Sequence, residues 1–285
     1  MTTDQGRIEL NKDDDASAVL TEQTRRAFDA AASVYDATYE HLYGIRRLRR
    51  LTHALFTQYY SRGDSLLELN CGTGSDAIAL AQEGMRVLAT DLSPGMVAEA
   101  QNKITGLGLG RLVEARRLSF QELGALRGTR FDGVYSNLGG INCTPDLSGL
   151  AADLSQLVRV RGVLIAVVMP PLCLWETVAF AARGQWRQAF RRLHAGGCAA
   201  HLHGGIVQTF YHSPNRFLRA FLRHFEPVEL MGLNIFTPPP NAVNFQALLG
   251  RGARLLERLD EAVAHTAPFS LVGDHFAIVM RRRAG

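Results

Sequence analysis

A short apolar run that ends in a glycine-rich turn constrains the fold of this chain more than any other feature. Residues 65–69 read as a buried strand, residues 70–74 as a tight turn, and residues 75–83 as a small-residue helix. A second apolar strand, 86–90, ends at Asp91. Glycines in the turn allow the backbone to pass close to a ligand. The arrangement predicts a nucleotide-type cofactor at the carboxyl end of the first strand, with Asp91 holding ribose hydroxyls.

Alternating strands and helices extend this pattern to residue 169. Ser93 and Pro94 begin the next helix as its N-cap and its first helical residue. Continuous apolar strands between helices specify a parallel sheet that is covered on both faces, so we predict a doubly wound α/β fold. The other expected elements are strands at 112–118, 131–136 and 162–169 and helices at 94–104 and 147–160.

Changes in composition and in hydrophobic periodicity divide the chain into four parts. Residues 1–20 are polar and acidic, and we expect them to form a disordered tail. Residues 21–62 show two helical periodicities and are expected to form a lid. Residues 63–170 hold the cofactor-binding core. Residues 171–285, where the alternation breaks down, are expected to supply substrate-binding insertions and the remaining strands of the sheet.

Two cofactors fit the turn, and Glu68 separates them. Gly72, Gly74 and Ala77 match the dinucleotide fingerprint G-x-G-x-x-A. A carboxylate on Glu68, at the end of the first strand, would repel a pyrophosphate in a site of reduced dielectric. The same carboxylate suits a ligand that carries an ammonium and a sulfonium, and S-adenosylmethionine (SAM) is such a ligand. SAM also offers a ribose to Asp91 and has no phosphate.

The residues around both strand ends resemble the class I SAM-dependent methyltransferases. The segments that carry the resemblance are 67–74 (LELNCGTG) and 90–96 (TDLSPGM). The resemblance covers residues 25–170 and implies an enzyme with a seven-stranded, mostly parallel sheet whose last strand is antiparallel. Residues 228–235 and 275–281 would be strands six and seven. Asn70 stands where the family usually has glycine, but Asn tolerates left-handed backbone better than other non-glycine residues.

The resemblance also implies which residues bind SAM. Glu68 would organise the turn and the aminobutyrate end, Asp91 would bind the ribose, and Leu92 would cover the adenine. The family often has an acidic residue after strand three for the adenine amino group, and Ser119 would accept that hydrogen bond here. The expected cofactor-binding residues are Tyr35, Glu68, Asn70, Cys71, Gly72, Gly74, Asp91, Leu92, Ser119, Phe120, Ser136 and Asn137.

The acceptor site is expected beyond strands four and five, beneath the N-terminal helices. Methyl transfer from a sulfonium is an in-line displacement, so alignment supplies much of the rate, and a base is needed only when the acceptor must lose a proton. Candidate bases are His41, His201 and His203, with ordinary polar roles as the alternative. No metal is expected, because these histidines lack acidic or thiol partners at ligand spacing. Candidate acceptor-binding residues are Tyr39, Asn142, Trp175 and Tyr211.

The charge of the chain limits its expected partners. There are 31 basic and 27 acidic residues, the net charge is +4, and only Lys12 and Lys103 are lysines. This excess is too small, and the arginines are too scattered, to indicate nucleic-acid binding. Four arginines between residues 183 and 192 have helical spacing. They form either a solvated helix face or an anion site for a substrate carboxylate, a phosphate or an acidic carrier protein.

These features together predict an enzyme that moves a methyl group from SAM to O or N of a small-molecule acceptor, in specialised metabolite biosynthesis. The acceptor is expected to be free, anionic or bound to a carrier protein, with no nucleic-acid or membrane partner, and the oligomeric state is left open. Four cysteines without a C-x-x-C pair, no signal peptide and no long apolar run favour a cytoplasmic protein. The alternatives are an RNA or protein methyltransferase, a SAM-using cyclase, and a non-catalytic partner with this fold.

Overall fold

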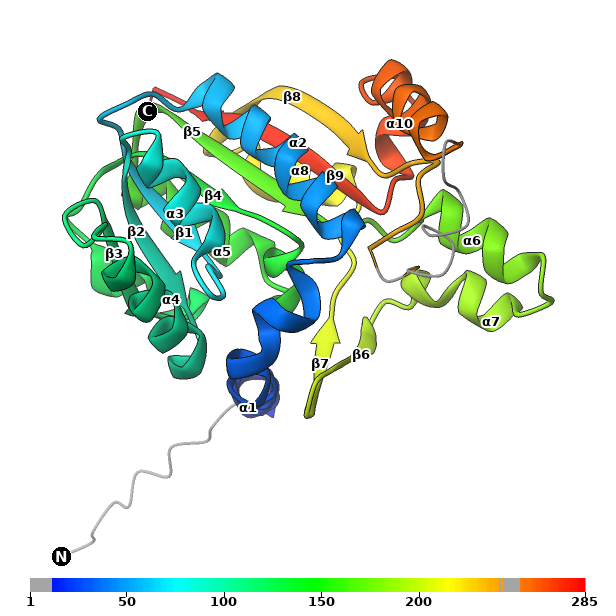
Figure 1. The fold of residues 1–285 in the computed structure, drawn as a ribbon, viewed down its shortest axis with the longest axis horizontal. Coiled ribbons are helices and arrows are strands. Elements are labelled where there is room, and N and C mark those ends of the chain that lie inside the picture. Colours follow the sequence, from blue (N-terminus) through cyan, green and yellow to red (C-terminus); the bar gives the residue numbers. More distant parts are fainter. Residues whose placement is uncertain (1–11, 241, 243–251, 285) are drawn as a thin grey trace, which may run out of the picture.

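The computed structural model describes residues 12–240, 242 and 252–284. Its centre is a seven-stranded sheet in the order β3-β2-β1-β4-β5-β9-β8 (Figure 1). The strands are β1 (Ser65–Leu69), β2 (Arg86–Asp91), β3 (Val113–Arg117), β4 (Phe131–Ser136), β5 (Val158–Val168), β8 (Phe225–Leu233) and β9 (His275–Arg282). The first five strands pair in parallel, whereas β9 is antiparallel to both β5 and β8. The predicted sheet is therefore confirmed, including its antiparallel last strand.

Helices cover both faces of this sheet. On one face, apolar residues of α2 (Tyr43–Tyr59), α3 (Ser75–Gln82) and α4 (Pro94–Gly106) form one buried core with the sheet. On the other face, α5 (Leu147–Leu157), α8 (Pro214–Phe221) and the 3-10 segment η1 (Phe120–Leu126) form a second core. Leu66 contributes to the first core and its neighbour Leu67 to the second, as strand alternation requires. This two-sided burial confirms the doubly wound α/β fold.

Several expected boundaries are wrong. Helix α1 runs from Lys12 to Tyr39, so it begins inside the segment 1–20 that was expected to be disordered. Residues 12–20 contain no glycine or proline, and nothing in the sequence stops the helix from extending toward the N-terminus. The helix expected at 147–160 ends at Leu157, because the chain turns directly into β5. The expected strand at 228–235 begins three residues earlier, at Phe225.

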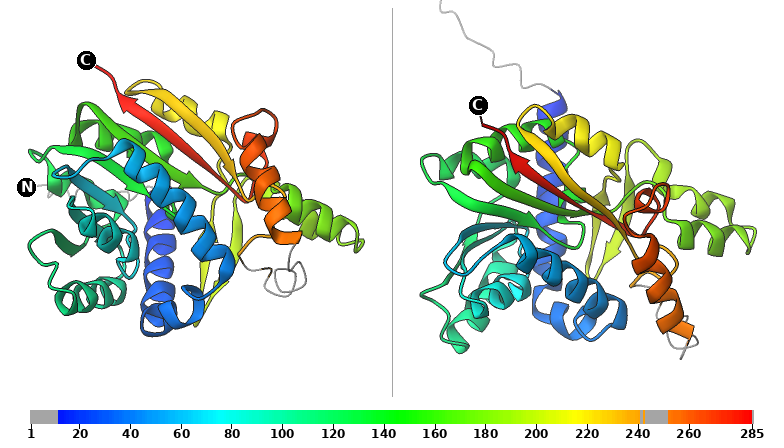
Figure 2. Two further views of the ribbon diagram at one scale, coloured as in Figure 1. Left: turned by 45° about the horizontal axis from the view of Figure 1, so that its top comes forward. Right: turned by 90° about the horizontal axis from the view of Figure 1, so that it is seen from above.

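The C-terminal part of the chain adds elements outside the sheet. These are α6 (Leu174–Ala181), α7 (Trp186–Ala189), the 3-10 segments η2 (Gly140–Cys143), η3 (Arg191–Leu193) and η4 (Phe269–Leu271), the hairpin of β6 (Cys198–Leu202) and β7 (Gly205–Thr209), and α10 (Gly252–Val263). The sequence also predicts an amphipathic helix at residues 248–264; α10 forms part of it, and residues 248–251 lie outside the described residues. Figure 2 shows α6 and α7 projecting from the body of the molecule. No described helix has the length and apolar character that a membrane span requires.

Helix α1 is wedged between the sheet domain and the β6–β7 hairpin. On the hairpin side the fit depends on Gly205, where a Cβ atom would lie 2.6 Å from the Cβ of Ala27. On the other side Ala32 packs against Gly95, at the start of α4. Helix α1 therefore lies at the carboxyl edge of the sheet, whereas α2, the other part of the predicted lid, packs on a face of the sheet (Figure 1).

Candidate functional site

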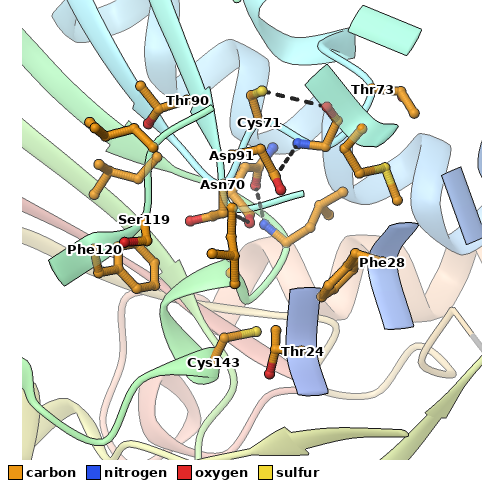
Figure 3. A pocket seen from close by; sticks show the side chains of 18 of the residues that line it. Thr24, Phe28, Asn70, Cys71, Thr73, Thr90, Asp91, Ser119, Phe120 and Cys143 are labelled. Atoms are coloured by element: carbon orange, nitrogen blue, oxygen red, sulfur yellow. Dashed lines mark hydrogen bonds between the residues drawn. The ribbon is translucent and has the colours of Figure 1, made fainter. Parts of the chain in front are cut away.

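A cavity of about 1030 Å3, including its open mouth, lies at the carboxyl ends of β1, β2 and β4. Asn70, Cys71 and Asp91 stand at its centre, Ser119 and Phe120 lie to one side, and Phe28 of α1 lies opposite them (Figure 3). Of the expected cofactor-binding residues, the structure brings nine to the cavity wall: Tyr35, Asn70, Cys71, Gly72, Asp91, Leu92, Ser119, Phe120 and Asn137.

The turn after β1 adopts the backbone that its sequence predicts. Asn70, Gly72 and Gly74 all have positive φ, at 52°, 53° and 79°. Asn70 thus accepts the left-handed conformation where the resembling family usually has glycine. Gly74 does not line the cavity but ends the turn beside α4, since a Cβ there would lie 3.0 Å from the Cβ of Ala100. Ser136 also lies behind the wall, and its hydroxyl donates to Oδ1 of Asn70 at 2.8 Å.

Asp91 ties the turn to the second strand. Its Oδ2 accepts from the amide of Gly72 and its Oδ1 from the amide of Ser93, both at 2.9 Å. The side chain is almost fully buried, and burial raises its pKa from 3.8 to about 6, although the two amides oppose that rise. Each carboxylate oxygen keeps a lone pair that can accept a further hydrogen bond.

Glu68 does not reach the cavity, contrary to its expected role at the aminobutyrate end. Its side chain points to the same sheet face as Leu66, under α2 and α3, and is 2% exposed. Burial raises the pKa of Glu68 well above its usual range, and the nearby charge of Asp76 raises it further, while the hydroxyl of Tyr135 opposes the rise. Glu68 therefore belongs to the core beneath α2 and α3 and not to the cavity wall.

A different carboxylate, Asp76, lines the cavity in place of Glu68. It lies in the first turn of α3 and pairs with Arg49 of α2 at 2.6 Å. Its second oxygen accepts from Nδ2 of Asn137 at 2.9 Å. Arg49 also pairs with Glu40 at 2.9 Å, and its Nε is buried without a hydrogen-bond partner. Sequence reasoning missed both residues, because nothing local indicates that α2 brings an arginine to this edge.

The opposite side of the cavity is apolar. Leu92, Leu118, Phe120 and Leu123 line it together with Met96. Ser119 lies among them as the N-cap of η1, where its side chain accepts from the backbone of Glu122 in a capping box. The hydroxyl is therefore already an acceptor, and its proton remains available for donation to a ligand.

Helix α1 closes the cavity with residues that the sequence did not single out, namely Thr21, Thr24 and Phe28. The helix is docked through carboxylates. Asp29 accepts from the amide of Gly95 at 3.0 Å, and Asp36 pairs with Lys103 at 2.7 Å. Both partners belong to α4, which also contributes Met96 to the cavity wall.

The expected acceptor residues lie away from this cavity. Asn142 is fully buried: Nδ2 donates to the carbonyls of Met169 and Phe210, and Oδ1 accepts from the amide of Met169. This buried amide joins the end of β5 to the chain beyond β7, and both of its N–H donors are used within the protein. Tyr211 lies under the guanidinium of Arg192, 5.1 Å from its ring centroid.

The other acceptor and base candidates are also outside the cavity wall. Tyr39 packs on Tyr35, with ring centroids 4.8 Å apart, and Trp175 lies on α6. His41, His201 and His203 are exposed. Neither the three histidines nor these aromatic residues are brought together in the described structure.

The arginines between 183 and 192 do not form a single anion site. Arg192 is buried and pairs with Glu176 at 2.6 Å and with Asp274 at 2.7 Å. Arg191 also pairs with Glu176. Their charges are therefore neutralised within the protein, and only Arg183 and Arg187 are fully on the surface.

Comparison with known proteins agrees with this geometry. Residues 66–162 match the family model described as a methyltransferase domain. Residues 66–162 therefore carry a methyltransferase domain. Solved structures with this fold include the [4+2]-cyclase SpnF, with 14% identity, a TM-score of 0.59 and coverage of 93% of this chain and 97% of that one. Another is the geranyl diphosphate C-methyltransferase of Streptomyces coelicolor A3(2), with 15% identity, a TM-score of 0.54 and coverage of 84% and 80%.

Curated relatives match about half of this chain. A demethylmenaquinone methyltransferase of Beutenbergia cavernae is 32% identical over 155 residues, which are 53% of this chain and 60% of the relative. A tRNA/tmRNA (uracil-C(5))-methyltransferase of Colwellia psychrerythraea is 29% identical over 154 residues, or 52% of this chain and 42% of the relative. The chain thus spans less than two thirds of the length of these relatives.

Proposed function

We propose that this protein binds SAM in the cavity at the carboxyl edge of the sheet and transfers its methyl group to O or N of a small-molecule acceptor. The observation that carries the proposal is the Arg49–Asp76 pair on the wall of the same cavity that holds Asp91. The pair presents one positive and one negative group, which is the complement of an amino-acid zwitterion. Asp91 presents acceptors for a ribose.

The methionine end of SAM fits the chemistry beneath α2 and α3. Arg49 has a buried Nε without a partner, and a guanidinium can donate to a carboxylate with two parallel hydrogen bonds. Asp76 would face the ammonium, and Asn137, which donates to Asp76, would hold that carboxylate in place. This assignment replaces the role first expected for Glu68.

The adenosine end fits the remaining wall. Asp91 would accept from the ribose hydroxyls, and Leu92 and Phe120 would pack on the adenine. Ser119, whose oxygen is used in the capping box, would donate to a ring nitrogen of adenine rather than accept from its amino group. The backbone of the turn 70–74 would contact the methionine portion.

A small acceptor is favoured over RNA by what covers the cavity. Helix α1 lies across the site and contributes Thr24, Phe28 and Tyr35 to its wall, so a large substrate has little access. The match to the tRNA-modifying relative is confined to about half of this chain. The relative from Beutenbergia cavernae and the geranyl diphosphate enzyme are named for small molecules. Specialised biosynthesis and a cytoplasmic location remain part of the proposal.

The amino-acid end of the site can be tested by calorimetric titration with SAM. Arg49→Met should weaken binding about 10- to 150-fold, because a charged hydrogen bond contributes about 1.5–3 kcal/mol. Arg50→Met is the matched control, since Arg50 is the next residue of α2 and is exposed. Equal affinities of the two variants would refute the assignment of Arg49.

The reaction itself requires an acceptor screen. Purified protein with SAM and separate pools of small molecules and RNA should form S-adenosylhomocysteine only with the former, with one methyl group added to the product by mass. Turnover only with the RNA pool would overturn the acceptor class. Conversion of an acceptor without S-adenosylhomocysteine would indicate a cyclase-type reaction instead.

A further inference from the structure

Helix α1 ends beside the arginine that the proposed function assigns to the carboxylate of SAM. Its last residue is Tyr39, and the next residue, Glu40, accepts a hydrogen bond from Nη2 of Arg49 at 2.9 Å. Ser75, the first residue of α3, donates its hydroxyl to the same oxygen of Glu40 at 3.0 Å. Glu40 therefore fastens the end of the lid helix to the part of the cavity wall that Arg49 forms.

Arg49 is shared between two carboxylates. Its Nη1 pairs with Asp76 at 2.6 Å, and its Nη2 pairs with Glu40 at 2.9 Å. Burial disfavours the charge of Arg49, but the carboxylates of Asp76 and Glu40 outweigh burial and hold the pKa of Arg49 above its usual range. Two carboxylates thus face one guanidinium, and the cluster has more negative than positive charge.

The shape of a guanidinium gives the position of Glu40 its importance. The Nε–H of an arginine lies parallel to one N–H of Nη2, and these two donors form an edge that matches both oxygens of a carboxylate. In Arg49, Nε is buried without a partner, while Nη2 already donates to Glu40. A carboxylate that binds this edge with two hydrogen bonds comes to lie beside Glu40, and the two anions repel each other.

Of the two protein carboxylates, Glu40 is the one that can leave Arg49. Asp76 is held from a second side by Nδ2 of Asn137, at 2.9 Å, and it would face the ammonium of SAM. The side chain of Glu40 is 27% exposed, against 12% for Asp76, so water can solvate the carboxylate of Glu40 when it moves away.

We propose that Glu40 competes with the carboxylate of SAM for Arg49, so that binding of SAM releases the corner between α1 and α2 at residues 40–42. The inference rests on the proposed function, because it takes Arg49 as the site of that carboxylate. Coupling between two binding events is reciprocal. Docking of Glu40 therefore lowers the affinity for SAM by the factor by which SAM weakens the docking. Glu40 thereby sets how strongly the site favours ligands that carry a carboxylate.

The rest of α1 stays in place when the corner is released. Asp29 accepts from the amide of Gly95, and Asp36 pairs with Lys103. Neither partner is assigned to the methionine end of SAM, so the cofactor does not compete for these contacts. The release is confined to the end of the helix that lies nearest to Arg49.

Two ligands separate this competition from a general effect on the site. Decarboxylated SAM keeps the adenosine, the sulfonium and the ammonium of SAM but lacks its carboxylate. In calorimetric titrations, Glu40→Gln should tighten binding of SAM about two- to fivefold, which is the effect expected of a partly exposed ion pair. The same variant should not tighten binding of decarboxylated SAM. Unchanged or weaker binding of SAM to this variant would overturn the proposal.

A matched variant controls for the loss of one negative charge. Asp36→Asn removes a carboxylate of the same helix, but this carboxylate pairs with Lys103 and not with Arg49. It should change the affinities for SAM and for decarboxylated SAM by the same factor. Selective tightening of SAM in Asp36→Asn would reduce the effect of Glu40 to general charge and refute the competition. Thermal melts of both variants establish that they are folded.

A second substitution distinguishes competition from support of the arginine. Glu40→Ala removes the hydrogen-bond acceptor as well as the charge, and it should tighten binding of SAM at least as much as Glu40→Gln does. If Glu40 instead held Arg49 in the orientation that SAM needs, Glu40→Ala would weaken binding of SAM. That result would contradict the proposal.

Hydrogen exchange measures the release of the corner directly. The amides of residues 37–42 should exchange faster in the complex with SAM than in the complex with decarboxylated SAM, because only SAM takes Arg49 from Glu40. Glu40→Gln should abolish this difference. Equal exchange in the two wild-type complexes would refute the release.

The outcomes also separate this inference from the proposed function. A wild-type protein that binds no SAM, or whose affinity for SAM is unchanged by Arg49→Met, overturns the cofactor site and the competition together. A wild-type protein that binds SAM through Arg49, with the same affinity as Glu40→Gln, overturns only the competition and leaves the proposed methyl transfer in place.

Discussion

Asp91 offers the sharpest test of the cofactor site, because its ionisation and its geometry are both defined. Burial raises the pKa of this carboxyl from 3.8 to about 6. The folded protein therefore holds the proton more tightly than the unfolded chain. The stabilising effect is fully present below about pH 4 and is lost as the pH rises through 6, which amounts to about 3 kcal/mol for a shift of about two units.

Binding of SAM should have the opposite dependence on pH. The ribose hydroxyls donate, so they favour ionised Asp91. Affinity should be constant above about pH 7 and should fall below pH 6, by up to about tenfold per unit. Calorimetric titration of S-adenosylhomocysteine between pH 5 and 8 measures this directly. Because this ligand keeps the ribose, it reports on the same contact without turnover.

Asp91→Asn should remove this dependence and weaken binding at neutral pH. Both carboxylate oxygens accept from backbone amides, so an Asn side chain must turn its own NH2 toward the N–H of Gly72 or of Ser93. The loss of one charged hydrogen bond corresponds to about 1.5–3 kcal/mol, or about 10- to 150-fold in Kd. Asp146→Asn is the control, because Asn caps a helix as well as Asp. Wild-type affinity in Asp91→Asn, or a variant that still titrates near pH 6, would refute the reasoning.

Three further changes probe the walls and the lid. Gly140→Ala should destabilise the protein by about 1–3 kcal/mol in urea, because the new Cβ would lie 1.7 Å from Nδ2 of Asn70, and an unchanged midpoint would contradict the tight contact. Asn142→Ala should cost about 3 kcal/mol of stability and leave KM for the acceptor unchanged, so a raised KM in a stable variant would restore Asn142 as a substrate contact. Asp36→Asn should lower the free energy of unfolding by less than about 1 kcal/mol, because the ion pair of Asp36 with Lys103 is partly exposed. Stopped-flow measurements should nevertheless show faster release of S-adenosylhomocysteine, at a rate that no longer depends on salt concentration. Release at the wild-type rate would contradict the prediction that the Asp36–Lys103 pair holds α1 closed over the ligand.

The parts of the site that the sequence predicts are those encoded within one strand and its following turn. Asn70 to Gly74 adopt positive φ at the residues that tolerate it, and Asp91 ends β2 beside them. Parallel neighbours bring these strand ends together whatever the rest of the chain does. The conformation of the turn and the position of Asp91 therefore follow the sequence prediction, and their contact with the cofactor stays a prediction.

Residues that reach the cavity from other elements are not predictable in this way. Arg49 lies on α2 and reaches Asp76 only because that helix crosses the sheet face above β1 and β4. Glu68 was assigned to the cavity because it lies near the end of β1. However, a side chain one residue before the end of a strand points to a face of the sheet and not to its carboxyl edge. Because Leu67 and Leu69 alternate with Glu68 along the strand, the sequence already indicates that Glu68 points to the opposite face of the sheet.

The predicted acceptor residues do not line the cofactor cavity, but part of their region is connected to it. The β6–β7 hairpin does not line the cavity, yet Gly205 packs on Ala27 of α1. The opposite side of α1 carries Asp29, Asp36 and Glu40, at i, i+7 and i+11, and these carboxylates bond the loops around the cavity. A displacement of the hairpin must therefore move a helix that is itself part of the cavity wall. The hairpin therefore supports the cavity wall through α1.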